Sequence, residues 1–211
     1  MSPTLAALIA GLVGGSPQTP PIFNPGAPGA APRVISVDEA VALSRSGHVE
    51  ADVRFMQHML VHHAQAVEMV ELLKSRGASP VVKRLGERIA QSQEAEMELM
   101  QEWLMGRGLP LAAPDPHAGH HGHAADPNAP VMPGMLSPAQ MAELAAAEGA
   151  EFDRLFLQGM TRHHQGALDM VEALLAEPDT AEDPMLSDFA SSVTADQSAE
   201  ILRMQSILSE L

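Results

Sequence analysis

The chain has 211 residues, a formal net charge of −15 at pH 7 and no cysteine. An acidic surface disfavours nucleic acid and anionic lipid as partners and makes cations the natural small ligands. Without cysteine, disulfides, thiolate metal sites and cysteine catalysis are excluded. Hydrophobic residues make up 45% of the chain but aromatic residues only 3%. The core must therefore be built from Leu, Ala, Val and Met, which suits closely packed helices.

The first 33 residues are interpreted as an apolar N-terminal segment followed by a Pro/Gly-rich linker. Residues 5–13 have the length of a signal-peptide core and are too short to span a bilayer, although no Lys or Arg precedes them. We expect a protein exported to the periplasm or the cell surface, with a cytoplasmic protein as the alternative. The Pro/Gly-rich stretch over 14–32 predicts a disordered linker.

Three helices are predicted between residues 36 and 105. Ser36 and Glu39 have the spacing of a capping box, which starts a short helix that ends near Gly47. A long helix follows over residues 50–75. The pair Ser79-Pro80 then starts its antiparallel partner, which runs to about residue 105.

The long helix carries histidine and methionine on the stripe that faces a core. The candidate metal ligands on this helix are Met56, His58, Met59, His62, His63 and Met69, with Asp52 as possible polar support. On the partner helix, Gln93 and Glu96 interrupt an apolar stripe. Buried polar groups are costly unless they are satisfied, so we expect histidines of the neighbouring helix to face them.

Residues 106–136 are predicted to be a linker because Pro, Gly, Ala and His dominate them. Four imidazoles lie within seven residues of this linker, at His117, His120, His121 and His123. A flexible loop of this kind can wrap Cu(II), Ni(II) or Zn(II) with modest selectivity. The alternative is a low-complexity insert with no ligand.

The last part of the chain, from residue 137 to 211, repeats the first helical unit. Ser137-Pro138 starts a short helix, a long helix follows over 150–176, and Asp183-Pro184 starts a partner that ends near residue 208. The repeat supplies Met160, His163, His164 and Met170 as candidate metal ligands, with Asp153 as possible support. Each of these residues follows its counterpart in the first copy by the same number of positions. Gln197 and Glu200 repeat the polar pair of the partner helix.

The repeat is not perfect. Gly159 replaces His58 and Leu157 replaces Met56, so the first copy is richer in ligands.

These elements predict an all-α fold, a ferritin-like four-helix bundle made of two duplicated helical hairpins with short leading helices and a long crossover linker. Neither hairpin could bury its apolar stripe alone. We therefore expect one domain over residues 34–211, built from the repeat 36–105, the linker 106–136 and the repeat 137–211.

The His/Met clusters allow two interpretations. Imidazole and thioether without thiolate select soft or borderline ions, Cu(I) first and Cu(II) at the His-rich positions. Zinc or another divalent metal is possible through histidine and carboxylate. The alternative is a closed Asp/His/Gln/Glu hydrogen-bond network that fixes helix register, with methionines as gap-fillers.

The pattern from Asp52 through HH-x-x-A-x-x-M, followed by the Gln93 to Leu104 stripe, resembles the bacterial domain-of-unknown-function family 305. The similarity covers residues 36–104 and 137–208. It implies a ferritin-like helical bundle and, by analogy with exported cyanobacterial members, copper binding linked to copper resistance. Carried over residue by residue, it implies that the shared polar or metal-binding positions are Met59, His62, His63 and Met69, with Met160, His163, His164 and Met170.

The leading hypothesis is a non-catalytic copper-binding protein for sequestration, tolerance or delivery, with a metal donor or acceptor protein as a possible partner. One alternative is an oxidoreductase with a di-iron or manganese site, although no Glu-x-x-His motif is present. The other is a purely structural helical module.

Overall fold

The computed structural model describes residues 20–24, 32–44, 47–113, 128 and 131–211, which fall into two compact units, Met1–Arg45 and Ser46–Leu211. In the first unit, strands β1 (Ile22–Asn24) and β2 (Arg33–Ile35) pair antiparallel, and helix α1 (Val37–Ser44) contacts β1. Strand β1 lies inside the stretch that we predicted to be a linker. Helix α1 belongs to this unit, whereas the sequence led us to group it with the bundle.

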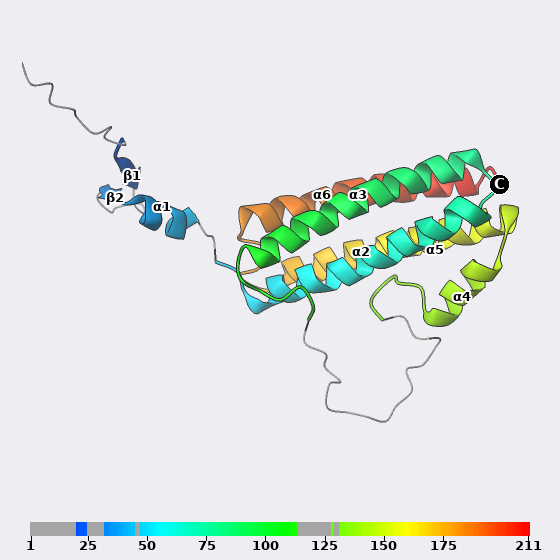
Figure 1. Cartoon of the computed structure of the whole chain (residues 1–211), viewed down its shortest axis with the longest axis horizontal. Helices are drawn as coiled ribbons and strands as arrows, with labels where there is room; N and C mark the ends of the chain where they lie inside the picture. Colours follow the sequence, from blue (N-terminus) through cyan, green and yellow to red (C-terminus); the bar gives the residue numbers. More distant parts are fainter. Residues whose placement is uncertain (1–19, 25–31, 45–46, 114–127, 129–130) are drawn as a thin grey trace, which may run out of the picture. The chain divides into compact units, whose positions relative to one another are not determined.

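The second unit contains the four-helix bundle (Figure 1). The helices of this unit are α2 (Glu50–Arg76), α3 (Pro80–Met105), α4 (Pro138–Ala146), α5 (Gly149–Ala176) and α6 (Pro184–Leu208), and all of them except the short α4 form the bundle. Hairpins α2–α3 and α5–α6 pack against each other mainly through α2 and α5. The predicted all-α fold, with its duplicated hairpins, is therefore confirmed. Within the described part of the chain, no helix is long and apolar enough to cross a membrane.

The helices start where the sequence places their caps. The hydroxyl of Ser79 accepts the N–H of Val82 at 3.4 Å, and the carboxylate of Asp183 accepts that of Leu186 at 3.1 Å. Each of these helices has proline in its first turn, where a missing N–H costs nothing. The side chains of Ser137 and Gln140 close a capping box at the helix start that Ser137-Pro138 predicts.

Helices α2 and α5 run antiparallel, so the two copies of the repeat are related by a pseudo-twofold axis. Arg54 at the start of α2 pairs with Glu177 at the end of α5 (3.7 Å). At the other end, Arg76 pairs with Glu148 (3.9 Å). The His/Met segments of both copies therefore meet halfway along the bundle.

Asp52 and Asp153 anchor the ends of the bundle. Asp52 accepts the backbone N–H of Val49 at 3.0 Å and that of Ala181 at 2.9 Å. Asp153 accepts N–H groups of Ala78 and Ser79, the latter at 2.7 Å. Each carboxylate thus holds the interhelical turn of the opposite hairpin. The sequence suggested that these residues support the histidines, and the structure places them elsewhere.

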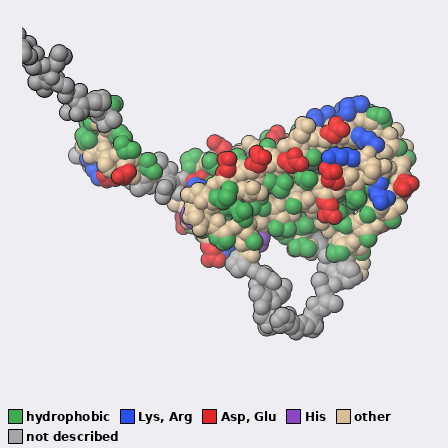
Figure 2. Space-filling model, viewed as in Figure 1, with side chains coloured by type: hydrophobic (Ala, Val, Ile, Leu, Met, Phe, Trp, Pro, Cys, Tyr) green, Lys and Arg blue, Asp and Glu red, His purple; other side chains and the backbone are tan. Residues whose placement is uncertain are grey.

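Charge is unevenly distributed along the bundle. Figure 2 shows Lys and Arg side chains gathered at the end where α2 turns into α3. The basic residues of that segment are Lys74, Arg76, Lys83, Arg84 and Arg88. At the other end, exposed acidic side chains belong to Glu50, Glu177, Asp179 and Glu182. A cation is therefore favoured at the end where α2 begins and α5 ends.

Candidate metal centre

Four imidazoles lie together in the middle of the bundle, His62 and His63 on α2 and His163 and His164 on α5. All four side chains are fully buried. The rings of His62 and His163 lie 3.8 Å apart between centroids with their planes tilted by 39°, whereas the rings within each pair are 6.4 and 6.3 Å apart. We call these four residues the histidine layer. The prediction that both pairs face inward is confirmed.

The outer two histidines pair with glutamates inside their own hairpins. Nε2 of His63 donates to Glu96 on α3 at 2.5 Å, and Nε2 of His164 donates to Glu200 on α6 at 2.6 Å. A carboxylate only accepts, so Nε2 carries the hydrogen in both rings. The expectation that histidines satisfy these two glutamates is therefore confirmed.

The inner two histidines donate to backbone carbonyls instead. Nε2 of His62 lies 3.0 Å from the carbonyl oxygen of Pro133, and Nε2 of His163 lies 2.9 Å from that of His62. The acceptor Pro133 belongs to residues 131–136, which we call the 131–136 segment. The sequence did not predict this contact, because the segment was interpreted as linker.

In every ring of the histidine layer, Nδ1 is buried and has no hydrogen-bond partner among the described residues. The same is true of Oε1 of Gln93 and of both amide atoms of Gln197, so the expectation that histidines satisfy these glutamines as well is wrong. A buried polar atom without a partner costs about 1–3 kcal/mol. The hydrogen-bond network is therefore open, whereas the structural alternative predicts a closed one.

The inner rings are held neutral. Burial, followed by the proximity of His63, lowers the pKa of His62 from 6.5 to about 4, although the Pro133 carbonyl opposes the shift. Burial and the neighbouring His62, His164 and His63 lower the pKa of His163 well below its usual value. At neutral pH both Nδ1 atoms therefore keep a free lone pair.

Methionines flank the histidine layer on both sides. The hydrophobic cluster on one side contains Met59 and Met100 and packs against Met170; the cluster on the other side contains Met160, Met204 and Met69. The pseudo-twofold axis exchanges these two triads. Met56 is buried in the first cluster. Thioether sulfur, a ligand for soft ions, is therefore available on either side of the imidazoles.

Two groups of predicted ligands are not in this buried centre. His58 is exposed, on the wall of a surface cavity. The linker histidines His117, His120, His121 and His123 lie outside the described residues.

Nitrogen and oxygen ligands alone do not make a preformed site here. Within the described ranges, no three His, Cys, Asp or Glu side chains are grouped so that they could hold a metal ion. A metal at the histidine layer would therefore need either thioether ligands or a low coordination number. Both conditions disfavour zinc and di-iron chemistry, which rely on histidine and carboxylate, and favour a soft ion.

The 131–136 segment closes over the seam between α2 and α5. Gln65 bonds both backbone groups of Leu136, at 2.7 and 2.9 Å. On α5, Gly166 lets the chain approach so closely that an added Cβ would lie 2.1 Å from the Pro133 carbonyl oxygen. Gly166 and Gly159 replace Gln65 and His58 of the first copy, two turns apart on one face. These two departures from the repeat are the signal that could have predicted the contact.

The sequence and the fold both have known relatives. Residues 52–208 match the family model described as a domain of unknown function, DUF305. A DUF305 protein of Streptomyces coelicolor, described as a candidate secreted protein, is 32% identical, with 76% of this chain and 93% of that chain covered and a TM-score of 0.64. A DUF305 fragment from Deinococcus radiodurans is 31% identical over 78% and 99% of the two chains, with the same TM-score.

A third structure, CopM in its Cu(I)-bound form, is 27% identical, with 75% of this chain and 96% of that chain covered and a TM-score of 0.57. CopM has also been solved in a Cu(II)-bound form. No curated protein sequence matches the chain.

Proposed function

The chain belongs to the DUF305 family, and we propose that it is a non-catalytic protein that binds Cu(I) at the histidine layer. One observation carries this proposal: four buried imidazoles have Nε2 fixed by an oxygen acceptor and Nδ1 without a partner in the described structure. Metal-ligating histidines have this arrangement, in which one nitrogen donates to a carboxylate or carbonyl and the other binds the metal.

The surroundings of the layer favour a singly charged, soft ion. The inner rings are neutral, and among the described residues their Nε2 atoms donate to backbone carbonyls and not to carboxylates. Burying a divalent ion in such a site would cost far more than burying a monovalent one. The flanking methionines offer the thioether sulfur that Cu(I) prefers. Glu96 and Glu200, at the edges of the layer, strengthen the donor character of His63 and His164.

The relatives support the same chemistry. CopM, a structural neighbour, has been solved in Cu(I)-bound, Cu(II)-bound and Ag-bound forms. By analogy we propose sequestration, tolerance or delivery of copper, with a metal donor or acceptor protein as partner. The secreted character suggested for the Streptomyces coelicolor relative supports export. The linker histidines, residues 117–123, would add capacity for Cu(II).

The test is a Cu(I) titration against a chromophoric chelator under reducing conditions, combined with thermal melting with and without Cu(I). The double variant His62→Ala/His63→Ala should lose tight binding and any Cu(I)-dependent rise in melting temperature. His48→Ala, which changes a histidine outside the layer, is the control and should keep both. A wild-type protein whose stability does not respond to Cu(I), combined with a large loss of stability in the metal-free double variant, would establish the structural alternative instead.

A further inference from the structure

A surface cavity of about 250 Å³ lies where α2 begins and α5 ends. Three soft-metal ligands line it, and each comes from a different part of the chain. His58 is on α2, Met170 is on α5, and Met132 is in the 131–136 segment. Phe55 and Leu174 supply apolar wall. A hydrophobic cavity with a few convergent ligand groups has the character of a small-ligand site.

The position of Met132 in this wall is fixed by the contacts that hold its segment. Gln65 bonds Leu136 on one side, and the backbone of Pro133 and Gly134 is seated against Gly166. Pro133 is shared between two environments, because it lines the cavity and its carbonyl accepts the Nε2 hydrogen of His62. The cavity is thus next to the histidine layer.

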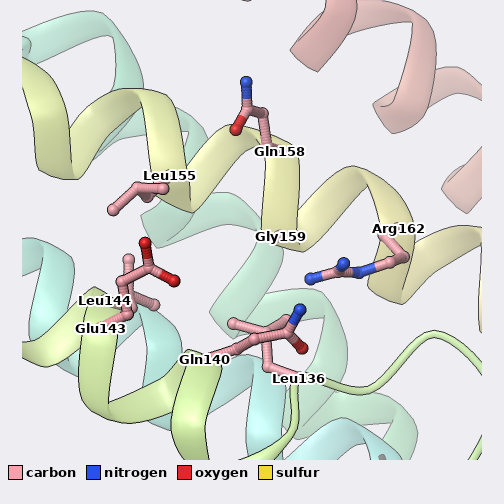
Figure 3. A pocket seen from close by; sticks show the side chains of 8 residues that line it. All are labelled: Leu136, Gln140, Glu143, Leu144, Leu155, Gln158, Gly159 and Arg162. Atoms are coloured by element: carbon pink, nitrogen blue, oxygen red, sulfur yellow. The ribbon is translucent and has the colours of Figure 1, made fainter. Parts of the chain in front are cut away.

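The other copy of the repeat provides an internal comparison. Its cavity, of about 260 Å³, contains Gly159, the counterpart of His58 (Figure 3). The remaining wall is made of Leu136, Gln140, Glu143, Leu144, Leu155, Gln158 and Arg162. Met69, the counterpart of Met170, is fully buried, and its terminal methyl group would lie 3.2 Å from a Cβ added at Gly159. The second cavity therefore has neither His nor Met in its wall, although it is similar in size.

The charge around the first cavity suits a cation. Arg54 lines the cavity but is paired with Glu50 at 3.0 Å and with Glu177 at 3.7 Å. Its positive charge is thus offset by two carboxylates, and this end of the bundle carries the exposed acidic groups described above. The acidic side chains around the opening would attract a monovalent cation, and the His and Met side chains of the wall could then coordinate it.

We propose that His58, Met132 and Met170 form an outer Cu(I) site, beside the histidine layer and absent from the second copy of the repeat. The inference rests on the proposed function, since it takes the bound ion to be the same soft metal. The site would load from solvent, because His58 is exposed, and Pro133 both lines its cavity and accepts a hydrogen bond from the ring of His62.

The test uses Ag(I), a redox-inert substitute for Cu(I), on the full chain with ¹³C-labelled methionine methyl groups. NMR then reports each methionine separately, so metal bound by the linker histidines does not interfere. We expect the methyl signals of Met132 and Met170 to shift on addition of Ag(I). The double variant Met132→Leu/Met170→Leu should lose about one equivalent of Ag(I), while signals of Met59 and Met160 beside the histidine layer still respond. Met105→Leu, at an exposed methionine outside the cavity, should change nothing.

The outcomes separate the two proposals. If only the fully buried methionines, such as Met59 and Met160, respond to Ag(I), the outer site is overturned and the proposed function stands. If Met132 and Met170 respond and the buried methionines do not, the outer site stands and the buried centre fails. If His58→Gln leaves the Met132 and Met170 shifts and the affinity unchanged, the three-ligand site is overturned. An unchanged Ag(I) capacity in the Met132→Leu/Met170→Leu variant would overturn it as well.

Discussion

His62 and His163, 101 residues apart in the chain, meet in the seam between α2 and α5, with ring centroids 3.8 Å apart and ring planes tilted by 39°. His163 donates to the backbone of His62, and His62 donates to Pro133. These two rings therefore join the two copies of the repeat and the segment between them. Neither Nδ1 atom has a partner within the described structure. This arrangement leaves the Nδ1 lone pairs of both rings available to a ligand.

Replacement of Glu96, the carboxylate that accepts the Nε2 hydrogen of His63, should weaken metal binding. In Glu96→Gln, His63 keeps a hydrogen-bond acceptor of similar shape but loses the charge that strengthens its donor nitrogen. We expect Cu(I) affinity to fall about 10-fold or more, with folding retained. Competition with a chelator measures the affinity, and Glu94→Gln, at an exposed position on the same helix, is the control. Equal affinities for both variants would contradict the role assigned to Glu96.

The metal-free protein should lose stability as the pH falls from about 6.5 to about 4. The folded pKa of His62 is about 4, below its ordinary value of 6.5, so the unfolded chain binds more protons in this window. His62 alone should account for a loss on the order of 3 kcal/mol. Urea denaturation at several pH values measures the slope. His62→Asn/His163→Asn should flatten it, and an unchanged slope in this variant would show that other groups cause it.

A side chain at Gly166 should dislodge the 131–136 segment. The added Cβ of Gly166→Ala would meet backbone atoms of Pro133 at 2.1 and 2.4 Å, which cannot move without lifting the segment. We expect a loss of about 1–3 kcal/mol in the free energy of unfolding. Gly159→Ala is the matched control, because its Cβ meets only flexible side-chain atoms, the nearest at 3.2 Å. The prediction fails if the two variants are equally stable.

The aspartates at the bundle ends should affect stability and not metal binding. Asp153→Ala removes the acceptor of the Ala78 and Ser79 N–H groups. It should cost about 1–3 kcal/mol and leave Cu(I) affinity unchanged. Denaturation and chelator competition on the same sample give both values, with the exposed Asp169→Ala as the control. A drop in Cu(I) affinity would show that Asp153 contributes to the metal centre and would contradict this prediction.

Much of the bundle could be predicted from the sequence, because its signals are local. Ser79-Pro80 and Asp183-Pro184 mark helix starts, and the repeated stripe places the histidine pairs inside. The pairing of His63 with Glu96 also follows, since a buried glutamate needs a partner. What escaped prediction depends on contacts between distant segments. The Pro133 carbonyl on His62 is one example, and it depends on the backbone approach that Gly166 permits.

The partners of Asp52 could not be predicted from the sequence either. Its place on the helix stripe predicted a position near the histidines. In the structure it instead accepts N–H groups from Val49 and from Ala181, which lies in the turn of the other hairpin. Helical periodicity gives the face of a residue, but not its partner along the length of the bundle.

The central claim is that Nδ1 in the histidine layer is free in the metal-free protein and binds the metal. Long-range ¹H–¹⁵N NMR of the imidazoles of His62, His63, His163 and His164, recorded before and after addition of Ag(I), tests it most directly. We expect the hydrogen of the inner rings on Nε2, Nδ1 signals typical of an unprotonated nitrogen, and a shift of Nδ1 signals in the layer when Ag(I) binds. Protonated Nδ1 atoms in the inner rings, or Nδ1 signals throughout the layer that stay unchanged while Ag(I) binds elsewhere, would contradict the claim.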